Sequence, residues 1–178
     1  MSLKESKYLI VYFSRPGNNY VGGRIANLPV GNTEVVAKMI HKIMGGDIFR
    51  IESVNAYPAD YTETTEVAEQ ELRANARPKL TGHLESMASY NVVFLGYPNW
   101  WGTMPMPVFT FLEEYDLSGR KIVPFCTHEG SGIGRSVTDI KKLCPRSTIL
   151  DGLAVRGGDV KNAHNEVSAW LRNIGIKN

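Results

Sequence analysis

The chain has 178 residues, of which 43% are hydrophobic and 21% charged, and its formal net charge at pH 7 is +2. This is enough apolar material for one sizeable core, so we expect a single domain over residues 1–178. Lys and Arg are scattered without a basic stripe, which argues against a nucleic-acid partner. No apolar run reaches the roughly 18 residues of a membrane span, and the first residues lack a signal-peptide core. We therefore expect a cytoplasmic protein with no membrane partner, in which Cys126 and Cys144 are free buried thiols.

The first elements alternate between strand and helix. Residues 7–13 are rich in β-branched and aromatic side chains and predict a strand. Residues 16–31 are polar and glycine-containing, too irregular for a helix, and predict a long loop. A helix is expected from Asn32, a favoured N-cap, to the glycines at 45 and 46. In the strand that follows, Ile48 is expected to face the core. Later strands are predicted over residues 47–54, 91–97, 121–126 and 147–155, and later helices over residues 62–76, 107–115, 135–143 and 161–174.

Five alternations of strand and helix predict an α/β fold. Parallel strands need crossover connections, and these crossovers pack as helices. We therefore expect a three-layer sandwich with a five-stranded parallel sheet. In such a sheet all the loops that lead from strand to helix lie at one edge, where ligands of open α/β sheets bind.

The loop after the third strand carries two adjacent tryptophans, Trp100 and Trp101. Neighbouring side chains in a loop at the end of a strand splay apart, so both rings cannot easily enter the core. One interpretation is structural: one ring packs on the next helix and the other covers an apolar edge. The functional interpretation is an aromatic wall for a flat ligand.

The loops after the first and fourth strands are polar. The first holds Ser14, Arg15, Asn32 and Thr33 around the start of a helix, and such a helix start suits a phosphate group. Asn32 and Thr33 could equally be a simple capping pair. The loop over residues 127–134 has three glycines that let backbone N–H groups approach a ligand. Together the three loops suit a ligand with a phosphate at one end and a flat aromatic group at the other.

Three segments make the chain resemble the flavodoxin family over nearly its whole length. They are Tyr12-Phe-Ser-Arg15 with Gly31-Asn-Thr33, Gly96-Tyr-Pro-Asn-Trp-Trp-Gly-Thr-Met-Pro105, and Phe125-Cys-Thr-His-Glu-Gly-Ser-Gly132. The resemblance implies a flavodoxin-like sheet of order 2-1-3-4-5 and flavin mononucleotide (FMN) bound without a covalent link.

The resemblance also implies site residues. Four would hold the phosphate, namely Ser14, Arg15, Asn32 and Thr33. Nine would frame the isoalloxazine ring, namely Pro98, Asn99, Trp100, Trp101, Gly102, Thr127, His128, Glu129 and Gly130. No catalytic side chain and no metal are implied.

Two features depart from the family pattern of electron carriers. About fourteen residues intrude between Arg15 and Gly31, and Trp101 stands where carriers usually have a glycine near flavin N5. The second loop also resembles that of NAD(P)H quinone reductases. We therefore expect a redox protein that passes electrons through FMN to a partner protein or a small quinone-like acceptor. The alternatives are an NAD(P)H-dependent FMN quinone reductase and a non-redox flavin-binding sensor. A thiol or metal site at Cys126 and His128 is a weaker possibility.

Overall fold

Strand β5 (Val92–Pro98) lies at the centre of a parallel sheet, and its first six residues are buried, as its apolar sequence predicts. The computed structural model describes residues 7–177 of the chain. Beside β5 lie β1 (Tyr8–Tyr12) on one side and β6 (Lys121–His128) on the other, and every strand pair in this sheet is parallel. The predicted α/β class is confirmed.

The sheet has six strands where five were predicted. Its order is β4-β1-β5-β6-β7, with β4 at Asp47–Arg50 and β7 at Thr148–Ile149, and β8 (Leu153–Arg156) also pairs with β6. The strand predicted over residues 147–155 is thus two short strands that pair with different parts of β6. Pro124 lies between the two pairings, and proline has no N–H to donate to a neighbouring strand.

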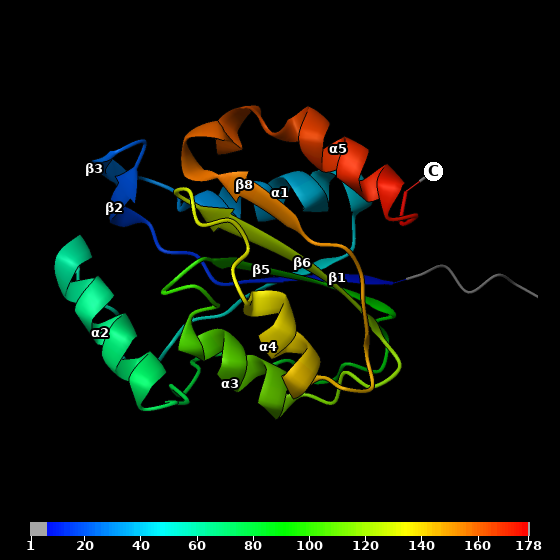
Figure 1. Cartoon of the computed structure of the whole chain (residues 1–178). Coiled ribbons are helices and arrows are strands. Elements are labelled where there is room, and N and C mark those ends of the chain that lie inside the picture. Colours follow the sequence, from blue (N-terminus) through cyan, green and yellow to red (C-terminus); the bar gives the residue numbers. More distant parts are fainter. Residues whose placement is uncertain (1–6, 178) are drawn as a thin grey trace, which may run out of the picture.

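Helices cover both faces of the sheet (Figure 1). Helices α1 (Asn32–Met44) and α5 (His164–Asn173) lie on one face, and α3 (Met106–Glu114) and α4 (Ser136–Leu143) lie on the other. Each face encloses an apolar cluster, because successive residues of β1 point alternately to one cluster and to the other. None of the helices within residues 7–177 is long and apolar enough to cross a membrane.

Helix α2 (Tyr61–Arg73) stands at one end of the molecule, beside the segment between β1 and α1 (Figure 1). It begins at Asp60, whose carboxylate accepts the N–H of Glu63 at 2.9 Å. Only Thr64 and Ala68 of this helix are buried, in agreement with the thin apolar face predicted from its sequence.

Residues 16–31 contain a β-hairpin, so the prediction of an irregular loop is wrong. Strand β2 (Gly17–Val21) pairs with β3 (Arg24–Leu28) in antiparallel register. Gly22 and Gly23 form the two-residue turn, with φ angles of +61° and +85°. Two residues with positive φ are what the tightest hairpin turns need, so this Gly-Gly pair was the signal that the sequence offered.

Several predicted boundaries are also wrong. The N-cap of α1 is Gly31, not Asn32, and the hydroxyl of Ser14 accepts the N–H of Glu34 at 3.1 Å in place of a capping side chain. Strand β4 ends at Arg50, and Ile48 is 41% exposed, because β4 is an edge strand with a neighbour on one side only. The last helix begins at His164 and follows a 3-10 helix, η1 (Gly157–Asn162).

Candidate functional site

The three loops singled out in the sequence meet in one cavity of about 340 Å³ at the carboxyl edge of the sheet. A second cavity of about 440 Å³ adjoins it and shares Arg15, Tyr61, Asn99 and Trp100 with it. The predicted site residues that line the first cavity are Ser14, Arg15, Asn32, Thr33, Pro98, Asn99, Trp100, Thr127, His128 and Glu129. Trp101 and Gly102 line the second cavity, whereas Gly130 lines neither.

The start of α1 lies unusually close to the end of β1. A side-chain carbon built on Gly31 would come within 2.2 Å of Ser14 Oγ and 2.9 Å of the Arg15 carbonyl oxygen, so only glycine fits there. The segment that contains the hairpin therefore returns to its own starting point. This brings the Ser14 hydroxyl against the first turn of α1, where helix N–H groups have no partner inside the helix.

A buried hydrogen bond joins the first loop to the third. The Thr33 and Thr127 hydroxyls lie 2.7 Å apart, and the two residues are 2% and 3% exposed. Thr33 belongs to the first turn of α1, and Thr127 lies near the end of β6. Because β1 and β6 are separated by β5, this bond holds together loops from strands that do not touch.

Asn99 joins the second loop to the third. Its backbone N–H donates to the Thr127 carbonyl at 2.8 Å, and its amide nitrogen donates to the Gly132 carbonyl at 2.7 Å. Its amide oxygen accepts the N–H of Gly102 at 2.9 Å. One side chain thus fixes the tryptophan turn on one side and the glycine-rich loop on the other.

The two tryptophans point in different directions. Trp100 is partly buried and meets Phe13 and Tyr57 edge to face, with ring centroids 5.2 and 5.0 Å away. Trp101 is 49% exposed, and its indole N–H donates to the Thr65 carbonyl of α2 at 2.9 Å. Its φ of +55° is rare outside glycine and is held by the tight turn that pairs Trp100 with Thr103.

His128 has a defined proton arrangement. Its Nδ1 accepts the N–H of Gly130 at 2.9 Å, so the neutral ring carries its proton on Nε2. Burial, followed by the nearby positive charge of Arg156, lowers the pKa of His128. Neighbouring Cys126 is buried and free, and burial raises its thiol pKa to about 12, which is unfavourable for a reactive thiolate.

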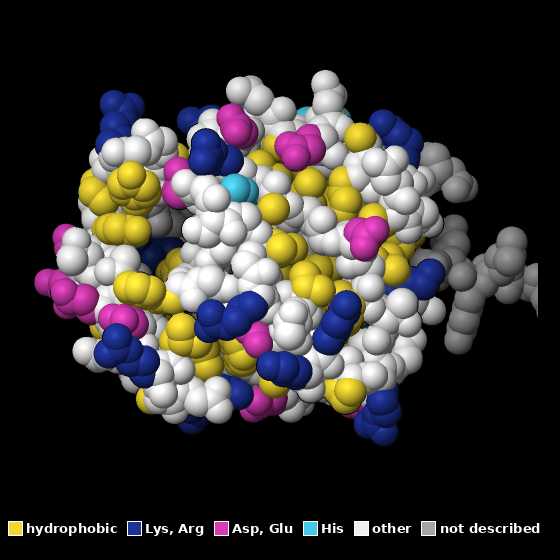
Figure 2. Space-filling view, viewed as in Figure 1, with side chains coloured by type: hydrophobic (Ala, Val, Ile, Leu, Met, Phe, Trp, Pro, Cys, Tyr) yellow, Lys and Arg dark blue, Asp and Glu magenta, His cyan; other side chains and the backbone are white. Residues whose placement is uncertain are grey.

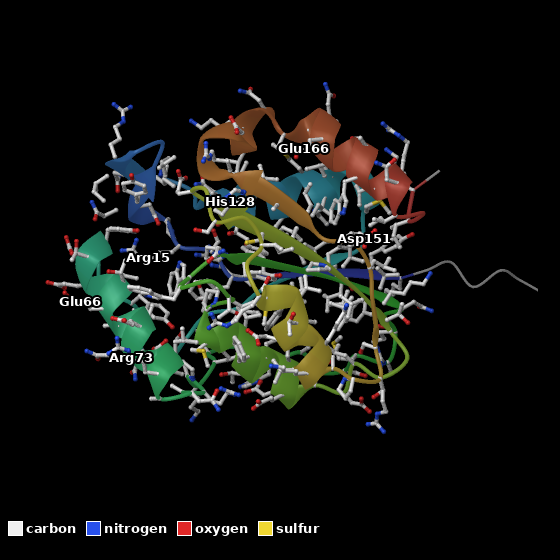
Figure 3. All side chains as sticks on the ribbon, viewed as in Figure 1. Arg15, Glu66, Arg73, His128, Asp151 and Glu166 are labelled. Atoms are coloured by element: carbon white, nitrogen blue, oxygen red, sulfur yellow. The ribbon has the colours of Figure 1, made fainter. Side chains whose placement is uncertain are left out.

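The guanidinium of Arg15 is directed at backbone carbonyl groups. It donates to Pro58 at 2.9 Å and Ala59 at 2.8 Å, and also to Asn18 of the hairpin. Figure 3 shows Arg15 between the hairpin and the start of α2. Burial lowers its pKa, and it forms the wall between the 340 Å³ cavity and a larger cavity of about 610 Å³ beside the end of β4.

Several lining residues were not anticipated from the sequence. They are Asn19, Tyr20 and Leu28 of the hairpin, Tyr61 of α2 and Ser131. Tyr20 and Tyr61 stack with ring centroids 6.1 Å apart, and the Asn18 side-chain oxygen accepts the N–H of Tyr61 at 2.7 Å. Because residues 16–31 are predicted as an irregular loop, the sequence alone places none of the hairpin residues at the cavity, whereas Ser131 lies in the glycine-rich loop already expected there.

The family model for flavodoxin matches residues 7–174. The structure is similar to that of a provisionally named flavoprotein from Bacteroides eggerthii, at 30% identity and a TM-score of 0.79, with 97% of this chain and 100% of that chain covered. A flavoprotein from Lactobacillus acidophilus, solved in complex with FMN, has 19% identity and a TM-score of 0.61, with 93% and 98% covered. A provisionally named quinone reductase from Klebsiella pneumoniae has 12% identity and a TM-score of 0.52, with 97% and 86% covered. A search among curated proteins found no match.

The bond between Thr33 and Thr127 can be tested by a double-mutant cycle. Thr33→Val or Thr127→Val alone leaves one buried hydroxyl without a partner, so we expect the free energy of unfolding to fall by about 1–3 kcal/mol. The double variant removes both hydroxyls and should lose clearly less than the sum of the two single losses. Urea denaturation of the four proteins measures this, and strictly additive losses would show that the two hydroxyls do not interact.

The pKa of His128 should respond to Arg156. Arg156→Gln removes one of the two causes that lower this pKa, so NMR titration of the His128 ring should give a higher value in the variant. The pKa of His128 is lower in the folded protein than the 6.5 of an unfolded chain. The contribution of this lowered pKa to the free energy of unfolding is therefore complete above about pH 6.5 and is lost as the pH falls below that value. The loss should be smaller in the variant. Arg146→Gln, at the opposite edge of the sheet, should leave the titration unchanged, and an unchanged pKa in Arg156→Gln would refute the assignment.

Proposed function

The chain belongs to the flavodoxin family, and we propose that it binds FMN without a covalent bond and passes electrons through it to a partner protein or a small quinone-like acceptor. The observation that carries the proposal is the meeting of the three loops in one cavity. The cavity offers hydroxyls and a helix start at one end and aromatic rings with backbone polar groups at the other.

The residues at the start of α1 fit a phosphate. Gly31 lets the start of α1 pack closely against Ser14 and the Arg15 carbonyl, which brings the Ser14 hydroxyl to the first turn of the helix, and the positive end of the helix dipole favours an anion. In this proposal the hydroxyls of Ser14 and Thr33 and the amide of Asn32 hold the phosphate. Arg15 contributes positive charge from the side, because its guanidinium donates to neutral backbone carbonyl groups and Asp60 nearby offsets its charge only in part.

The tryptophan turn and the loop after β6 fit the ring system. In this proposal, residues 98–102 frame one edge of the ring, and Thr127, His128 and Gly130 frame another. Hydrogen bonds from Asn99 hold these two loops in place relative to each other. Bound FMN would supply the redox chemistry, and the protein supplies orientation and electrostatics. The neutral His128 ring, with its proton on Nε2, can donate a hydrogen bond without adding charge beside the ring system.

One observation favours a reductase as a second candidate. The adjoining cavity of about 440 Å³ lies between α2 and the tryptophan turn and is lined by Tyr61, Trp100 and Trp101. Its aromatic walls and size suit a second flat molecule beside the first. A nicotinamide or a quinone could use this space, and the protein would then be an NAD(P)H-dependent FMN reductase.

The proposal is tested by optical titration. We expect the purified protein to bind FMN, with a change in flavin absorbance that saturates at one FMN per chain. Riboflavin, which lacks the phosphate, should bind at least roughly tenfold more weakly, because it loses charge-assisted hydrogen bonds at the start of α1. A protein that binds no flavin, or that binds both flavins equally, would contradict the proposed site.

Anaerobic addition of NADH or NADPH then separates the two candidates. Loss of flavin absorbance within seconds supports the reductase, because the pyridine nucleotide then reaches the flavin directly. An unchanged spectrum supports an electron carrier that depends on a separate reductase. Free FMN at the same concentration is the control for reduction that does not need the protein.

A further inference from the structure

Glu129 carries a buried carboxylate oxygen without a partner. It follows β6 directly and lines the 340 Å³ cavity. Its Oε2 accepts the N–H of Gly22, at the tip of the hairpin, at 3.0 Å. Its Oε1 is buried and has no hydrogen-bond partner among the described residues. An unsatisfied carboxylate oxygen is expensive to bury, so this oxygen needs an explanation.

The surroundings of Oε1 place it between the two ends of the cavity. A side-chain carbon built on Gly157 would lie 2.1 Å from Oε1 and 2.6 Å from the amide nitrogen of Asn32, so Gly157 leaves the space that the carboxylate occupies. Asn32 belongs to the proposed phosphate end, whereas Thr127 and His128, just before Glu129, belong to the proposed ring end. The carboxylate of Glu129 thus lies between residues of the proposed phosphate end and residues of the proposed ring end.

The hydrogen-bonding capacity of a carboxylate limits which ligand groups Oε1 can bind. An ionised carboxylate is only an acceptor, so it needs a hydrogen-bond donor. A phosphate dianion would be repelled by it. In FMN, the sugar-alcohol chain between phosphate and ring carries hydroxyl groups, and each of these can donate.

We propose, on the basis of the function proposed above, that Glu129 Oε1 accepts a hydrogen bond from a hydroxyl of the FMN sugar-alcohol chain while Oε2 holds the tip of the hairpin. Glu129 is then a clasp that fastens the β2–β3 hairpin over the bound cofactor. Other hairpin contacts agree with this role, because Asn19, Tyr20 and Leu28 line the same cavity.

The β2–β3 hairpin contacts α2 on one side of the cavity and Glu129 on the other. Its base is tied to α2 by the bond between Asn18 and Tyr61 and by the stacking of Tyr20 on Tyr61. Glu129 adds a contact on the far side of the cavity, in the loop after β6. Figure 2 shows apolar side chains on the outer surface of the hairpin, and Tyr20 and Ile25 remain 40% and 50% exposed. The hairpin therefore spans the cavity from α2 to Glu129.

Glu129→Gln tests the clasp with three ligands. The variant places an amide NH2, a donor, at one of the two carboxylate positions and removes the negative charge, so the two charge-assisted hydrogen bonds to Gly22 and to the cofactor hydroxyl cannot both be kept. We expect FMN and riboflavin, which share the sugar-alcohol chain, to bind roughly tenfold more weakly in the variant and by the same factor. Lumiflavin, which has a methyl group in place of that chain, should bind the variant and the wild type equally. Stopped-flow release of FMN should be faster from the variant.

Glu166→Gln is the matched control. Glu166 is an exposed carboxylate on α5, away from the hairpin (Figure 3), and its removal should change none of the three affinities. Thermal unfolding of the ligand-free proteins checks that both variants fold.

Four outcomes would overturn the assignment of Glu129. One is unchanged binding of all three ligands. A second is tighter binding of FMN alone, which would place the carboxylate against the phosphate. A third is an equal loss for lumiflavin, which would place it against the ring. Failure of the wild type to bind any flavin would overturn the proposed function and the clasp together, whereas the first three outcomes would leave the function standing.

Discussion

The hydrogen bond between the hydroxyls of Thr33 and Thr127 is the contact on which the shape of the site depends. Both residues are almost fully buried, and the bond joins loops that follow strands on opposite sides of β5. Asn99 then fastens the loop after β5 to the loop after β6, through its backbone N–H and its amide nitrogen, and its amide oxygen holds the tryptophan turn. A parallel sheet brings these loops to one edge, but these polar links hold them at fixed separations.

The inserted hairpin is compatible with this arrangement because its two ends meet. Gly31 allows the chain to return to Ser14, and the Ser14 hydroxyl replaces the missing capping side chain of α1. The start of the helix therefore stays open to a ligand although the hairpin intervenes. Arg15 ties the hairpin to the segment before α2 by donating to carbonyl groups on both sides. The insertion becomes a wall of the cavity and does not disturb its base.

Much of this architecture could be predicted from the sequence, because apolar runs and helix boundaries are local signals. The convergence of the three loops follows from the alternation of strand and helix alone. The hairpin was missed because its strands are polar and gain their order from Tyr61 and Glu129, far away in the sequence. The side-chain orientations of Arg15, Trp100 and Trp101 likewise depend on contacts with the segment before α2, with Tyr57 and with α2 itself. These contacts are distant in the sequence, so no local pattern could reveal the orientations.

The central claim is that one ligand touches all three loops, and amide hydrogen exchange with and without FMN tests it most directly. The account predicts slower exchange on FMN addition in residues 14–34, 98–103 and 127–132 together, since the polar links between the loops make them one unit. Protection confined to a single loop would contradict the account. So would protection centred on residues 50–59, around the 610 Å³ cavity on the other side of Arg15.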